Sequence, residues 1–208
     1  MQMGKKQDNS GEKIWDEIFK RIVQEMPDQL LPLIEDVFGV KYPRDIQITK
    51  LATEHVIPAK NPKHLTSIYS DVTVKIGEDI YHFEFQMTNE RDMTIRMIKY
   101  DFNIALANSI VEFNDGSFSI DFPKSAVIYP AVNEKVPDYL TCNINFADGT
   151  SHEYRIPTVK IQSYDLKTIR EKHLTLFLPF LLLRFRPRLS SKKNPLSESE
   201  LTEFLNEI

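Results

Sequence analysis

Cysteine and glycine are scarce in this 208-residue sequence, which has one cysteine, Cys142, and six glycines. One thiol cannot form an internal disulfide or a multi-thiolate metal site, so we expect a reducing compartment. The N-terminus lacks the apolar stretch of a secretory signal. The densest apolar run, residues 174–183, is about half the length of a membrane span, so we expect it to be buried in the fold. These absences favour a cytoplasmic protein that contacts no membrane.

An excess of basic charge is also absent. The 26 Lys and Arg residues face 30 Asp and Glu residues, which argues against a basic nucleic-acid coat protein but permits a local basic face. No repeat of 20–50 residues is present, which excludes a solenoid. The length and the 41% hydrophobic content predict one domain with a sizeable core. We expect a polar tail over residues 1–12, a single domain over 13–188, and a linker with a short helix over 189–208.

Hydrophobic periodicity predicts alternating helices and strands. Helical spacing over residues 13–26 and 30–38 predicts two N-terminal helices, and looser alternation over 46–56 predicts a first strand. Residues 89–113 form a long, mostly apolar helical pattern, which neighbours should cover on most sides. The rest of the chain predicts a strand over 125–132, a hairpin of 139–146 and 151–161, a helix over 166–185 broken near Pro179, and a C-terminal helix opened by Ser197 and Glu200. This order of elements is typical of an α/β or α+β fold.

A second hairpin lies between the first strand and the long helix. Residues 69–76 and 80–86 alternate as strands do, and they flank Gly77-Glu78. A type II′ turn requires glycine at its first central position, so these two residues predict a two-residue turn in which Ile76 pairs with Asp79.

This register brings acidic side chains together. Asp71 falls opposite Glu84 on one face, and Gln86 lies two residues further on the same face. Like charges that face each other destabilise a strand pair, so a positive charge should lie between them. Mg²⁺ prefers oxygen ligands, and Mn²⁺ could replace it. Such an ion activates water and neutralises phosphoryl charge, which suits phosphodiester hydrolysis.

At these residues the chain resembles the PD-(D/E)XK nuclease superfamily, and within it the recombination-promoting nuclease and putative transposase branch of bacteria. The matching motifs are Ser70-Asp71, Glu84-Phe85-Gln86, Met93-x-x-Arg96 with Tyr100, and an initial Asp16-Glu17-Ile18-Phe19-Lys20. The resemblance covers about residues 14–132. It implies a restriction-endonuclease-like α/β fold, with a mixed sheet flanked by helices in the core (13–132) and a hairpin and helical extension over 138–188.

The resemblance further implies a Mg²⁺-dependent endonuclease that hydrolyses DNA and is linked to recombination or mobile elements. Asp71 and Glu84 would bind the metal, and Gln86 would orient the attacking water. Asp16 lies at the edge of the apolar stripe of its helix, whereas Glu17 points to solvent, so Asp16 is the better third carboxylate. It would support the ion directly or through water.

Two residues depart from the superfamily pattern. Gln86 replaces the usual lysine, and an amide cannot act as a cation or a general base, although it can position water. Ser70 replaces the usual proline. The alternative hypothesis is therefore a non-catalytic DNA-binding or protein-interaction module on the same fold, and a self-associating scaffold or homodimer also stays open. We expect His82, which shares the strand face of Glu84, on the strand surface and Tyr100 in the core.

Basic side chains could contact DNA at two places. Arg96 and Lys99 follow helical spacing on the long helix and could meet phosphates, or they could belong to a solvated face. Arg184, Arg186 and Arg188 have no intervening acid and form part of the most basic stretch. This stretch could follow a phosphate backbone or keep a loop soluble.

Overall fold

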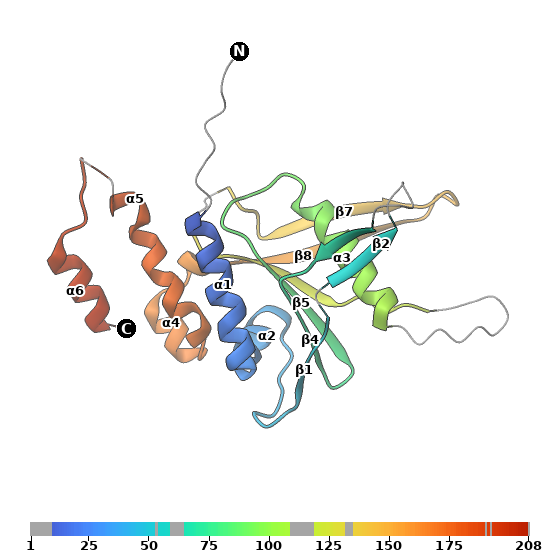
Figure 1. The fold of residues 1–208 in the computed structure, drawn as a ribbon, viewed down its shortest axis with the longest axis horizontal. Helices are drawn as coiled ribbons and strands as arrows, with labels where there is room; N and C mark the ends of the chain where they lie inside the picture. The colour runs from blue at the N-terminus through green and yellow to red at the C-terminus, as the bar shows by residue number, and fades with distance from the viewer. Residues whose placement is uncertain are drawn as a thin grey trace, which may run out of the picture.

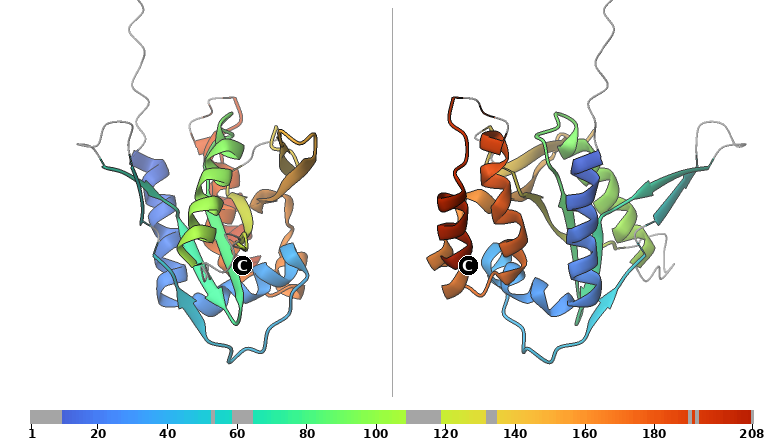
Figure 2. Two further views of the ribbon diagram at one scale, coloured as in Figure 1. Left: turned by 90° about the vertical axis from the view of Figure 1, so that its right-hand side faces the viewer. Right: turned by 60° about the vertical axis from the view of Figure 1, so that its left-hand side comes forward.

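The structure is a computed structural model that describes residues 10–52, 54–58, 65–108, 119–131, 135–189, 191 and 193–207. Within these ranges, six strands form one mixed sheet in the order β1-β4-β5-β6-β8-β7. Their bounds are β1 (Ile48–Lys50), β4 (Val72–Ile76), β5 (Asp79–Phe85), β6 (Lys124–Tyr129), β7 (Tyr139–Asn145) and β8 (Ser151–Lys160). Strands β5, β6 and β8 are parallel, and the other pairings are antiparallel. A two-stranded ribbon, β2 (Glu54–Pro58) and β3 (Leu65–Tyr69), projects from this body (Figure 2).

Helices cover both faces of the sheet (Figure 1). Helix α3 (Met93–Asn108) covers one face and provides the crossover that parallel strands β5 and β6 require. The other face is covered by α1 (Ser10–Glu25), α2 (Leu30–Phe38) and the C-terminal helical region. That region comprises α4 (Leu166–Glu171), the 3-10 helix η3 (Thr175–Phe185), α5 (Arg186–Leu189) and α6 (Glu198–Glu207), and two short 3-10 turns are η1 (Pro27–Gln29) and η2 (Ile161–Ser163). The predicted α/β class, with a mixed sheet flanked by helices, is confirmed.

The core consists of two apolar layers, one on each face of the sheet. In the larger layer, Phe85 of β5 stacks on Phe19 of α1 at 4.8 Å and packs against Phe180 of η3 at 4.9 Å between ring centroids. The smaller layer lies between α3 and strands β6 and β8, and includes Met97 and Val127. Because β5 is buried from both sides, the residues at its end have a firmly packed support.

The predicted hairpin register is confirmed. Ile76 pairs with Asp79, and Gly77 has a φ of 60°, as the first central position of a type II′ turn requires. The second predicted hairpin, β7–β8, and the two N-terminal helices are also present. The polar tail was predicted over residues 1–12, but residues 10–12 belong to α1, so the helix begins three residues earlier than predicted. Residues 1–9, the end of the long helix beyond residue 108 and residue 132 lie outside the described residues.

Two predicted elements differ. The single strand over 46–56 is replaced by β1 and β2, which belong to different sheets. The C-terminal helix breaks after α4, where His173 has a φ of 56° and the Leu174 amide donates to the Ile169 carbonyl, rather than near Pro179. Such a left-handed residue ends a helix by satisfying its last carbonyls. Pro179 lies inside η3, whose 3-10 bonding accommodates it.

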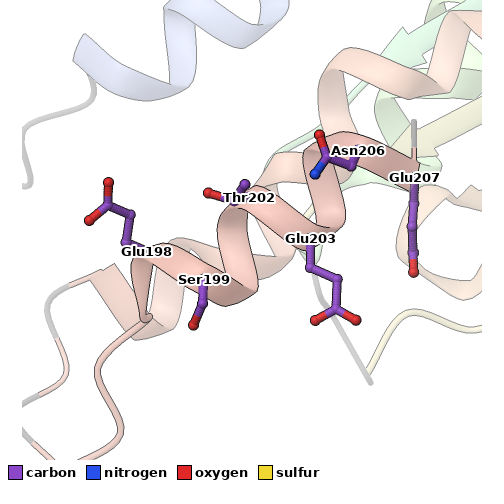
Figure 3. Close-up of a pocket in the computed structure, with 6 residues that line it drawn as sticks. All are labelled: Glu198, Ser199, Thr202, Glu203, Asn206 and Glu207. Carbon is purple, nitrogen blue, oxygen red and sulfur yellow. The ribbon is translucent and has the colours of Figure 1, made fainter.

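The C-terminal helix α6 begins as predicted. The Glu200 amide donates to Ser197 Oγ at 3.3 Å, and the Ser197 amide donates to Glu200 Oε2 at 3.1 Å. Figure 3 shows a shallow hollow on its outer face, where the polar side chains point to solvent: Glu198, Ser199, Thr202, Glu203, Asn206 and Glu207. This hollow contains none of the predicted site residues. No helix in the described part of the chain is long and apolar enough to cross a membrane.

Candidate functional site

Asp71 and Glu84 meet where β4 and β5 separate. Asp71 lies one residue before β4, and its amide donates to Glu84 Oε1 at 3.0 Å. In return, the Phe85 amide donates to Asp71 Oδ2 at 2.8 Å. Beyond the last paired residues of β4 and β5, the two segments are thus joined by hydrogen bonds between carboxylates and backbone amides. They lie at the carboxyl end of β5, the edge at which α/β sheets generally bind ligands.

Each of these carboxylates has one anchored oxygen and one less constrained oxygen. Glu84 Oε1 accepts from the Asp71 amide and lies 3.2 Å from His82 Nε2, whereas Oε2 has one contact among the described residues, Arg96 Nη2 at 3.5 Å. Asp71 Oδ2 is held by a backbone amide, whereas Oδ1 lies 2.7 Å from Lys20 Nζ. Two oxygens, one from each carboxylate, therefore face the long cationic side chains of Lys20 and Arg96.

Lys20 of α1 supplies a positive charge beside Asp71, but it contacts Asp16 as its second acid and not Glu84. Its Nζ bridges Asp71 Oδ1 at 2.7 Å and Asp16 Oδ2 at 2.9 Å. Burial lowers the pKa of Lys20, but its hydrogen bonds with Asp71 and Asp16 outweigh burial and raise the pKa, so it stays an ammonium. Sequence reasoning assigned Lys20 no role. The signal was its position four residues after Asp16, which places both side chains on one helix face.

His82 is fully buried, so the prediction that it lies on the strand surface is wrong. Helix α3 covers this face, and His82 Nδ1 lies 2.6 Å from Asp101 Oδ1. Asp101 also accepts from Ser125 Oγ at 2.7 Å and Tyr154 Oη at 2.6 Å. Both ring nitrogens face carboxylates, so both carry protons. Burial lowers the pKa of His82, but hydrogen bonds with Asp101 and Glu84 outweigh it and raise the pKa to about 9.

Within the described ranges, the carboxylates that form ion pairs at this site outnumber their cationic partners. Burial, and next the charge of Asp71, raise the pKa of Asp16, and burial is also the main cause that raises the pKa of Glu84. Asp16 Oδ1 is buried and has no hydrogen-bond partner among the described residues. Among the residues that the structure describes, three cationic side chains pair with five carboxylates: Lys20, His82 and Arg96 with Asp16, Asp71, Glu84, Glu90 and Asp101.

The oxygen donors at this site fit a metal ion whose coordination is completed by water and a substrate. No three acidic, histidine or cysteine side chains of the described chain converge into a ready metal site. Glu84 Oε2 and Asp71 Oδ1 would be the direct ligands, and Lys20 separates Asp16 from them. Mg²⁺ is commonly held by one or two carboxylates, waters and substrate phosphate, so two carboxylates suffice.

Four other residues named in the sequence-based predictions lie on the α3 side or at the end of β5. Gln86 directly follows β5 and is half-buried, and its backbone amide donates to the Ile128 carbonyl at 2.8 Å. Its side-chain amide has no hydrogen bond to the described residues, so this group is available to a ligand or water. Arg96 Nη1 pairs with Glu90 at 2.8 Å, and its other terminal nitrogen faces Glu84.

Lys99 is exposed and forms no ion pair within the described ranges. Tyr100 is half-buried beside His82 rather than in the core.

The C-terminal arginines lie on the opposite flank, by α6. Arg188 donates to both carboxylate oxygens of Glu200 at 3.0 and 2.9 Å. The Arg184 guanidinium lies over the Phe204 ring, 5.0 Å from its centroid. These contacts hold α6 against the domain. Arg186 is exposed, which leaves it the most accessible of the three predicted DNA contacts.

A groove of about 310 Å³ borders the acidic site on the α1 side. Its lining includes Asp71 and two lysines, Lys20 and Lys50. Lys50 is exposed, and its Nζ donates to the Gln24 carbonyl at 2.6 Å. Lysines beside a carboxylate site suit a phosphate-bearing ligand, because cations position nucleic-acid backbones without reading their sequence.

Comparison with known proteins identifies no relative: no protein-family model, no curated protein and no solved structure matches this chain.

Proposed function

We propose that this protein is a Mg²⁺-dependent endonuclease that hydrolyses DNA phosphodiester bonds, with a restriction-endonuclease-like fold of the PD-(D/E)XK type. The observation that carries the proposal is the meeting of Asp71 and Glu84 at the carboxyl end of β5. Each side chain is anchored through one oxygen and presents the other. A link to recombination or mobile elements follows from the motif resemblance, and Mn²⁺ would also support the reaction.

The carboxylates would hold the ion between two strands. Glu84 Oε2 and Asp71 Oδ1 are the proposed ligands, and the unpartnered Asp16 Oδ1 would accept a hydrogen bond from a water of the ion. When bound, Mg²⁺ lowers the pKa of a water and neutralises charge on the phosphoryl group.

The neighbouring side chains would act on the water and the phosphate. Lys20 would leave Asp71 and pair with a substrate phosphate, which supplies the cation that Gln86 cannot. The side-chain amide of Gln86 would orient the attacking water. Arg96 would move from Glu84 toward the phosphate, since its 3.5 Å contact there is long. Lys50 would hold the strand in the groove beside α1.

A plasmid-nicking assay tests the proposal. The protein should nick DNA with Mg²⁺ or Mn²⁺ and be inactive with EDTA, and Glu84→Gln should lower the nicking rate by about 10³-fold. Asp79→Asn is the matched control, because Asp79 is a carboxylate at the other end of the same hairpin. Activity that persists in Glu84→Gln would identify a contaminating nuclease.

A non-catalytic DNA-binding module on the same fold is the second candidate. It is favoured by the cations that already contact the acids, since Lys20 lies 2.7 Å from Asp71 and Arg96 lies 3.5 Å from Glu84. Such a module would shift DNA on a gel and leave it uncut with every metal. A self-associating scaffold would instead show a multiple of the chain mass by light scattering and no affinity for DNA.

A further inference from the structure

The imidazole of His82 is fixed between two carboxylates in the interior. Its Nε2 lies 3.2 Å from Glu84 Oε1, and its Nδ1 lies 2.6 Å from Asp101 Oδ1. The Tyr100 ring packs edge-on against it, with centroids 5.9 Å apart. All three polar side chains are at most 1% exposed. A buried ring with both nitrogens engaged cannot rotate without losing a hydrogen bond to a charged group.

We propose that His82 is a positioning residue of the candidate cation site, which holds Glu84 by Oε1 and so directs Oε2 toward a divalent cation. This inference rests on the proposed function and assigns a role to a residue outside the resembled motifs.

The arrangement of donors on Glu84 supports this role. Oε1 has two donors, His82 Nε2 and the Asp71 amide, whereas Oε2 has the single long contact with Arg96 in the described chain. Because two hydrogen bonds hold Oε1 in place, the direction in which Oε2 points is also fixed. Hydrogen bonds to a ligating side chain orient it, and their loss typically weakens metal binding or activity about 10–100-fold.

Asp101 in turn fixes His82, and parts of the fold remote from the site fix Asp101. Its two oxygens accept from His82, from Ser125 of β6 and from Tyr154 of β8. The β7–β8 hairpin, which follows the motif-bearing region in sequence, thereby supports the cation site. Asp101 in α3 is 0% exposed, and its carboxylate is tolerated there because its oxygens are hydrogen-bonded to side chains that the sheet holds in place.

Calorimetric titration with Mn²⁺, without DNA, tests this role in the full chain. His82→Gln and Asp101→Asn should each weaken Mn²⁺ binding about 10–100-fold. The matched control is Tyr164→Phe, which removes a tyrosine-to-carboxylate hydrogen bond of 2.7 Å to Asp36 outside this network. It should lower the melting temperature without changing the Mn²⁺ affinity. Glu84→Gln should remove the binding and so confirm where the ion sits.

The outcomes separate this inference from the proposed function. If the unsubstituted chain binds no Mn²⁺, or if Glu84→Gln binds it equally well, the proposed site fails and this inference fails with it. If the unsubstituted chain binds through Glu84 but folded His82→Gln and Asp101→Asn bind with unchanged affinity, His82 is merely structural.

A measurement without substitution covers the case in which both variants fail to fold. In the unsubstituted protein, the two His82 ring N–H proton resonances should both be visible by NMR. Both should shift to a limiting value on addition of diamagnetic Mg²⁺. Ring resonances that do not respond to saturating Mg²⁺ would overturn the positioning role.

Discussion

The β4–β5 hairpin carries carboxylates at both ends, and the two ends differ in how these charges are matched. At the turn, Asp79 accepts from Tyr42 at 2.7 Å and pairs with Lys124 at 2.7 Å, and its side chain is 40% exposed. Hydrogen bonds with Lys124 and then Tyr42 lower the pKa of Asp79. At the open end, Glu84 is 1% exposed, and burial raises its pKa despite its contacts with His82 and Arg96.

The difference separates a structural carboxylate from a functional candidate. A matched, solvated charge such as Asp79 stabilises the turn and needs no ligand. A buried carboxylate beside another one costs free energy, and such a cost is found mostly where a ligand or a reaction offsets it.

Removal of the carboxylate charge should affect catalysis at the open end of the hairpin and only stability at the turn. Glu84→Gln should lower the nicking rate by about 10³-fold, since the loss of metal-based charge stabilisation amounts to several kcal/mol. Asp79→Asn should leave the rate unchanged within about twofold and lower the melting temperature. Equal nicking rates for the two variants would end the distinction between the two ends.

The pH dependence of stability should arise from the open end. The pKa of His82 is raised from 6.5 to about 9, so its contribution is fully present below pH 6.5 and is lost as the pH rises through 9. The free energy of unfolding should fall by on the order of 2–3 kcal/mol from pH 6.5 to 9.5. Urea titrations at a series of pH values measure this, and His82→Gln should flatten the profile. The turn should add nothing here, because the pKa of Asp79 is lowered from 3.8.

Lys20 should compete with the cation, whereas Lys124 should not. Lys20→Met should tighten Mn²⁺ binding, because the ammonium contact with Asp71 is gone, and should lower the turnover rate by about tenfold or more. Lys124→Met removes the equivalent contact with Asp79 and should change neither quantity. Calorimetry and nicking rates at saturating Mn²⁺ provide both values, and weaker Mn²⁺ binding in Lys20→Met would contradict the competition.

The smallest effect concerns the tyrosines at the turn. Tyr42→Phe removes the hydrogen bonds to Asp79 and Tyr81 and should lower the free energy of unfolding by about 1 kcal/mol. Nicking should be unaffected. A loss of activity in this variant would show that the two ends of the hairpin are coupled through the sheet.

Sequence patterns predicted the parts of the site that depend on neighbouring residues. Glycine at position 77 and the alternation on either side determine the hairpin register, and the register alone brings Asp71 to Glu84. The amphipathic pattern of the first helix placed Asp16 at the edge of its buried face and Glu17 in solvent, and both positions are confirmed. The type and approximate bounds of most helices and strands follow from the same short-range signals.

The partners of those acids were decided by helices packed on opposite faces of the sheet. Lys20 reaches Asp71 from α1, and Asp101 reaches His82 from α3. His82 alternates with apolar neighbours on its strand, and that pattern alone predicts solvent on its side. Periodicity and turn chemistry act over a few residues, so the sequence by itself determined which carboxylates face each other. Only the tertiary structure decided which cations meet them and how deeply they are buried, because both depend on contacts between distant segments.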